Sequence, residues 1–161
     1  MKFSNTLSIG LMLATLATGC NQPASEPKAT PAPSTPTAEE HAPHGAGPNG
    51  GVVFDLGKYH AEFTVDHPTK ECTVLFVTGD AADAKPLPLA AKEFTLSIKE
   101  TKTADGTVVA PMTITLSPKD EQDGKAAKFV GTDPGIGNVA DFAGTVLGEI
   151  DGKPSQGEFE E

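Results

Sequence analysis

The chain has 161 residues, a formal net charge of −10 and no arginine. Nucleic-acid binding needs a basic surface, so the composition excludes that class, and it also argues against attraction to anionic lipid headgroups. The length suits one folded domain of ordinary size together with N-terminal segments that lie outside it.

Residues 1–19 have the pattern of a secretory signal peptide. Residues 6–17 are uncharged and mostly apolar. This run is too short to cross a bilayer, which takes about 20 apolar residues, and it fits the apolar region of a signal peptide instead. The segment is therefore predicted to be removed from the mature chain.

The signal ends in the letters LATGC, with small residues directly before Cys20. This ending resembles the lipobox of bacterial lipoproteins, although Ala17 stands where leucine is usual. The resemblance implies that the Cys20 thiol is lipidated and holds the protein to the membrane. Asn21 follows in place of the aspartate that favours the inner membrane, which implies an outer-membrane anchor facing the periplasm. The alternative is an ordinary cleaved signal followed by an incidental cysteine.

Residues 20–46 are predicted to form a lipidated, disordered tether. Residues 21–43 consist mainly of Pro, Ala, Thr, Ser and Glu and contain no large apolar side chain. Such a segment cannot bury enough surface to offset its ordering entropy. The folded domain is predicted to span residues 47–161.

Within this domain, apolar residues recur with period two between turn residues. The expected strands lie within residues 50–56, 59–66, 71–78, 91–100, 107–118, 125–133, 144–150 and 154–160. Seven to eight short strands separated by regular turn signals predict an all-β fold, a single antiparallel β-sandwich or partly open barrel. Residues 134–143 interrupt the strands and could hold one helical turn.

The first two strands predict a hairpin whose register can be worked out residue by residue. Gly57-Lys58 suits a two-residue type II′ turn, which places Asp55 opposite His60 and Val53 opposite Glu62. Alternation then assigns one face to the core and leaves Asp55, His60 and Glu62 on the other face. The same reasoning places Cys72 opposite Val65, on the core side.

Three of the four histidines fall within the stretch HAPHGAGPNGGVVFDLGKYHAEF, residues 41–63. The glycine-rich bend before the first strand could fold His41 and His44 back over the face that carries His60, Glu62 and Asp55. Two or three imidazoles with a carboxylate form a plausible ligand set for Cu²⁺ or Zn²⁺. The alternative is that these polar side chains only decorate a solvated strand face.

The same stretch resembles a motif of the form His-Gly-Gly, short strand, Gly-x-Tyr-His-x-Glu. The motif occurs in small exported proteins and in N-terminal regions of periplasmic adaptor subunits from heavy-metal efflux systems. The resemblance covers most of residues 44–159 and assigns motif positions to His60, Glu62 and His44, although residues 46–49 are inserted here. It implies metal binding near heavy-metal efflux components.

The remaining candidates favour simpler roles. Cys72 is expected to be a buried free thiol, with copper ligation as the alternative, and His67 is expected to cap or decorate a turn before Pro68. No catalytic motif stands out, so we expect a non-enzyme. The sequence thus predicts a membrane-anchored periplasmic lipoprotein that binds or buffers a transition metal. The alternative is a non-catalytic envelope protein that binds another protein or the cell wall, with incidental histidines.

Overall fold

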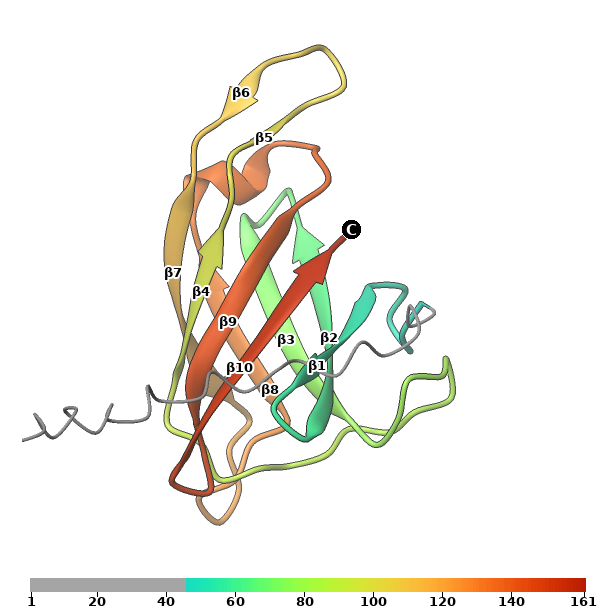
Figure 1. Ribbon diagram of the computed structural model, residues 1–161, viewed down its shortest axis with the longest axis vertical. Helices are drawn as coiled ribbons and strands as arrows, with labels where there is room; N and C mark the ends of the chain where they lie inside the picture. The colour runs from blue at the N-terminus through green and yellow to red at the C-terminus, as the bar shows by residue number, and fades with distance from the viewer. Residues whose placement is uncertain (1–45) are drawn as a thin grey trace, which may run out of the picture. The chain divides into compact units, whose positions relative to one another are not determined.

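The computed structural model describes residues 46–161, which form an all-β domain (Figure 1). Eight strands make one antiparallel sheet that is nearly closed into a barrel, and two short strands make a separate ribbon. This architecture confirms the all-β prediction in its partly open barrel form. No helix in residues 46–161 has the length and apolar character needed to cross a bilayer.

The large sheet contains the eight longer strands. They are β1 (Val52–Leu56), β2 (Tyr59–Asp66), β3 (Glu71–Val77), β4 (Phe94–Ile98), β7 (Met112–Lys119), β8 (Lys128–Thr132), β9 (Ala143–Ile150) and β10 (Lys153–Glu160). The ribbon pairs β5 (Thr101–Lys102) with β6 (Val108–Val109). The expected helical turn is the 3₁₀ turn η1 (Pro134–Gly137), within which Ile136 is fully buried.

Strand β7 joins the two halves of the barrel. The strand order is β1-β2-β3-β8-β7-β4-β9-β10. Residues 112–116 of β7 pair with β4, whereas residues 117–119 pair with β8. The sheet turns a corner along this strand, so that side chains from both halves face one interior.

The two edge strands, β1 and β10, meet at the seam of the barrel. The backbone N–H of Gly57 donates to the carbonyl oxygen of Gln156 at 3.2 Å. A Cβ on Gly157 would lie 2.2 Å from the carbonyl oxygen of Asp55, so only glycine lets the two backbones approach this closely. The Tyr59 hydroxyl donates to Asp151 at 3.0 Å across the same end of the seam. These contacts bring together edges that would otherwise be open.

The predicted register of the first hairpin is confirmed. Asp55 pairs with His60 and Val53 with Glu62. Gly57 adopts a φ of +64°, as the first position of the predicted turn requires. The next hairpin places Val65 opposite Cys72, also as predicted. Two regular hairpins therefore hold the candidate residues Asp55, His60, Glu62 and Cys72.

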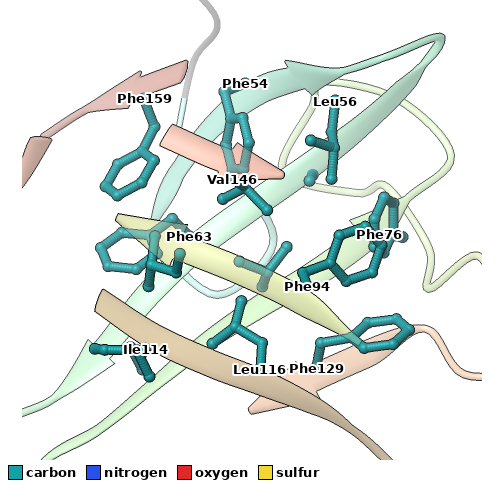
Figure 2. Close-up of a cluster of buried hydrophobic side chains, with 14 of the residues drawn as sticks. Phe54, Leu56, Phe63, Phe76, Phe94, Ile114, Leu116, Phe129, Val146 and Phe159 are labelled. Atoms are coloured by element: carbon teal, nitrogen blue, oxygen red, sulfur yellow. The ribbon is translucent and has the colours of Figure 1, made fainter. Parts of the chain in front are cut away.

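The core is a single cluster of aliphatic and phenylalanine side chains inside the barrel (Figure 2). Phe63 stacks on Phe159 with ring centroids 4.1 Å apart, which ties β2 to β10. Phe94 and Phe129 meet edge to face at 4.7 Å, which ties β4 to β8. Such aromatic pairs add stability beyond the burial of their area, and here they link strands from both halves of the barrel.

Cys72 lies within this core and is fully buried, as predicted. Its Sγ lies 3.5 Å from the carbonyl oxygen of Gly131 and donates to it. Desolvation by burial raises the pKa of the thiol from its ordinary value of 9.0 to about 12. Since the thiolate is the form that binds metals and attacks electrophiles, Cys72 is chemically shielded in the folded domain.

We expect the Cys72 thiol to resist alkylation until the domain unfolds. A rise in pKa from 9.0 to about 12 lowers the thiolate fraction at pH 8 by about a thousandfold, before burial blocks the reagent. In the Cys20→Ser chain, where Cys72 is the remaining thiol, labelling should be slow in buffer and fast in urea. Equal rates in the two conditions would contradict the buried position.

The same shift predicts how this group affects stability at alkaline pH. Folding raises the pKa, so the folded chain keeps a proton that the unfolded chain loses. The resulting contribution to stability is complete below pH 9 and is lost as the pH rises from 9 to about 12. A Cys72→Ala chain should lack this component of the alkaline decline in the free energy of unfolding.

Candidate functional site

Asp55 and His60 lie side by side on the outer face of the β1–β2 hairpin. His60 Nδ1 is 3.1 Å from Asp55 Oδ1, and the two side chains are 37% and 31% exposed. Nδ1 itself is shielded from solvent. A metal would therefore have to bind His60 through Nε2, with Asp55 orienting the ring from the other side. The structure brings together these two predicted site residues.

Glu62 has a different environment from the one its predicted role as a metal ligand requires. Its side chain is fully buried. Oε1 accepts hydrogen bonds from the backbone N–H of Asn49 at 2.7 Å and of Gly51 at 2.9 Å. Oε2 accepts a third from Asn49 Nδ2 at 2.7 Å. Both carboxylate oxygens are thus engaged by the chain itself, and the group acts as an anchor for the segment before β1.

That segment is a compact loop rather than a flexible bend. Ala46 forms an antiparallel bridge with Val52, and the Gly47 N–H donates to the Gly51 carbonyl at 2.9 Å. Gly50 closes the interior of the loop by donating to the Gly47 carbonyl at 3.0 Å. The loop therefore has fixed ends and its own internal hydrogen bonds. We call residues 46–51, together with Glu62, the glutamate clamp.

Two glycines let the loop lie directly on the strand. A Cβ on Gly47 would come within 2.5 Å of Glu62 Cδ, and a Cβ on Gly51 within 2.1 Å of the Phe63 carbonyl oxygen. Contacts this short would force the loop away from β2. The glycine-rich composition therefore reflects close approach to Glu62 and to the backbone of β2, not only freedom of the chain.

The glutamate clamp satisfies the buried charge without a cation. Hydrogen bonds between 2.7 and 2.9 Å fit the short distances of charge-assisted pairs. Converging N–H groups stabilise an anion as they do in backbone nests. Such a bond to a charged group contributes about 1.5–3 kcal/mol, so the three together give the loop a firm attachment to β2.

The described residues supply only part of the predicted metal site. Within residues 46–161, no group of three or more His, Cys, Asp or Glu side chains lies close enough to hold a metal ion. His41 and His44, like Cys20, the signal peptide and most of the tether, lie outside the described residues. The part of the predicted metal site that lies within the described residues is therefore the Asp55–His60 pair.

His67 lies beyond the other end of β2 and is separate from this pair. Its Nδ1 is 2.8 Å from the carbonyl oxygen of Ile136, so the ring connects the β2–β3 turn to η1. Its ring centroid is 6.4 Å from that of Phe142. His67 thus contacts the adjoining 3₁₀ turn, a structural role broader than the predicted decoration of its own turn.

An open pocket of about 380 Å³ lies beside His67 and was not predicted from the sequence. Its lining residues come from β2 and its turn, the β5–β6 ribbon, the segment before β9 and the last residue: Val65, His67, Lys102, Ala104, Val139, Ala140, Asp141 and Glu161. Burial raises the pKa of the Glu161 carboxyl, although the Phe142 N–H that donates to it at 2.9 Å acts against the rise. No local sequence pattern brings these distant residues together.

Sequence reasoning also missed Asn49, which donates two of the three hydrogen bonds to Glu62. Asn-Gly is a turn signal, so the sequence could show that the chain bends at this point. It could not show that the bend folds onto the face that carries Glu62. Comparison of the chain with known protein families, with curated proteins and with solved structures finds no match.

Proposed function

We propose that the protein is a lipid-anchored envelope protein, without catalytic activity, that binds or buffers a divalent transition metal, Cu²⁺ or Zn²⁺, near heavy-metal efflux components. His60 supplies one ligand, and His44 and His41 complete the set from the preceding chain. Cys20 carries the lipid that holds the protein to the outer membrane, facing the periplasm. Glu62, first predicted as a ligand, positions the loop instead.

The observation that carries the proposal is the glutamate clamp. It holds Gly47 over Glu62, on the face that also carries His60. Glu62 and His60 are two positions apart on β2, so their side chains project the same way about 6.5–7 Å apart. His44 is three residues before Gly47, and three residues of extended chain span up to about 10 Å. A segment of this length allows the proposed pairing of His44 with His60.

The chemistry of this set fits a borderline divalent ion. Neutral imidazole nitrogen binds Cu²⁺ and Zn²⁺ well, and Cu²⁺ is favoured by the usual order of divalent affinities. A carboxylate beside Nδ1, here Asp55, is a common second-sphere partner that sets the tautomer of a histidine ligand. The net charge of −10 also favours the accumulation of cations at the surface.

We expect the chain to bind Cu²⁺ more tightly than Zn²⁺ at pH 7.5 in isothermal titration. His60→Ala and His44→Ala should each weaken binding by about tenfold or more, because each removes a proposed ligand. Loss of a residue that only orients a ligand already costs about 10–100-fold in affinity. Affinity should be lower in acidic buffer, because protons compete with the metal for the imidazole nitrogen. His67→Gln is the matched control and should leave the affinity unchanged, because His67 lies beyond the far end of β2.

Two outcomes would contradict the site. If neither metal binds more tightly than about 0.1 mM, equivalent to about 5.5 kcal/mol, no functional site exists. If binding survives His60→Ala but disappears with His41 and His44 replaced together, the preceding segment alone is a weak chelator. Either result would favour the alternative proposal of a non-catalytic envelope protein that binds another macromolecule.

A further inference from the structure

The chain contains one Asn-Gly pair, Asn49-Gly50, and it lies inside the glutamate clamp. In such a pair the backbone nitrogen of the glycine can attack Cγ of the asparagine side chain. A new C–N bond closes a five-membered succinimide, and the side-chain nitrogen leaves as ammonia with the proton that Gly50 N loses. Water then opens the ring to aspartate or iso-aspartate. Glycine at the second position favours the attack because it has no Cβ to hinder it.

The folded loop holds both reacting groups in other hydrogen bonds. The attacking nitrogen, Gly50 N, donates its proton to the Gly47 carbonyl at 3.0 Å. The leaving group, Asn49 Nδ2, donates to Glu62 Oε2 at 2.7 Å. The backbone N–H of Asn49 is held by Oε1 of the same carboxylate. Reaction therefore requires the loop to leave Glu62 first.

We propose that Asn49-Gly50 is a self-modification site whose reaction is gated by the carboxylate of Glu62. While the glutamate clamp is closed, the reaction is suppressed. When the loop opens, Gly50 N can reach Cγ of Asn49. Water can then hydrolyse the succinimide, because Asn49 is exposed. The inference concerns the clamp and does not depend on metal binding.

The product cannot restore the original contacts. Hydrolysis replaces the donating Nδ2 with an oxygen, so that a carboxylate at position 49 faces Glu62 where the amide stood at 2.7 Å. Two like charges at this separation repel, and neither can donate a hydrogen bond to the other. Iso-aspartate also lengthens the backbone of a loop whose two ends are fixed. Modification thus converts a transient opening into a permanent one.

The test is the rate of deamidation in the full chain, followed as a mass increase in the proteolytic peptide that contains Asn49. At pH 8 and 37 °C the native chain should react at least about tenfold more slowly than the chain in urea. Breaking one charge-assisted hydrogen bond makes local opening of the loop less favourable by about this factor. Glu62→Gln should move the native rate toward the unfolded rate. Glu158→Gln, at an exposed position on β10, is the matched control and should have no effect.

A second measurement keeps the inference falsifiable if Glu62→Gln folds poorly. In the N49D chain, amide hydrogen exchange should become faster at Gly47 and Gly51 and stay slow in β3 and β4. Equal deamidation rates in native and urea-unfolded chains would overturn the proposal. It would also be overturned if the N49D chain kept the protection of the native loop.

Discussion

Replacing Glu62 with leucine is expected to lower the free energy of unfolding by about 2–4 kcal/mol. The change removes three charge-assisted hydrogen bonds and leaves the N–H donors of Asn49 and Gly51 without their acceptor. Water can reach part of the opened loop, so the cost stays below the sum of three separate bonds. Urea denaturation at pH 7 measures it.

The isosteric variant separates loss of shape from loss of charge. Glu62→Gln keeps the volume of the side chain but places an NH₂ group where one carboxylate oxygen accepts hydrogen bonds. We therefore expect the free energy of unfolding to fall by about 1–3 kcal/mol. Glu158→Gln, on the exposed side of β10, should change stability by less than about 0.5 kcal/mol. If Glu62→Gln and Glu158→Gln were equally stable, the carboxylate would not be the anchor of the loop.

The hairpin could be predicted because local chemistry determines it. A two-residue turn at Gly57-Lys58 leaves one register for the flanking strands, and alternation then assigns every side chain to a face. The pair of Asp55 with His60 follows from that step, and the pair of Val65 with Cys72 follows from the same reasoning applied to the turn at residues 67–70. No long-range information was needed to place Cys72 in the core.

The role of Glu62 could not be predicted in the same way. Alternation puts its side chain on the outer face, and an outer-face glutamate is ordinarily solvated. The structure covers that face with residues 46–51, and the carboxylate becomes fully buried. A glycine-rich segment can extend into solvent or fold back onto the sheet. Here the outcome depends on contacts of residues 47–51 with Glu62, which lies 11 to 15 positions away in the sequence, and a short-range pattern does not predict such contacts.

Closure of the barrel likewise depends on distant contacts. The strand pattern fits a sandwich and a barrel equally well, because both alternate apolar and polar residues. The barrel follows from β7, which pairs with β4 over its first part and with β8 over its last part. It follows also from Gly157, where the missing side chain lets β10 approach Asp55 on β1.

The second large effect concerns the anchor. Cys20→Ser should abolish labelling by radioactive palmitate and release the chain from the membrane fraction, because the serine hydroxyl does not replace the thiol in lipidation. Each buried methylene of a lipid chain contributes about 0.8 kcal/mol to membrane attachment, so losing the chains removes the whole attachment. The domain should still fold, because the core cluster of the barrel is formed by side chains between Phe54 and Phe159.

The two cysteines provide a matched pair for this test. Cys72→Ala should keep full lipid labelling and membrane attachment, since that thiol is buried in the barrel core and is predicted to take no part in anchoring. It should instead lower the free energy of unfolding by about 1 kcal/mol, as a small core truncation does. Cell fractionation and labelling of both variants beside the wild type decide the matter. A mature Cys20→Ser chain that stays in the membrane fraction would show that the anchor is not the Cys20 lipid.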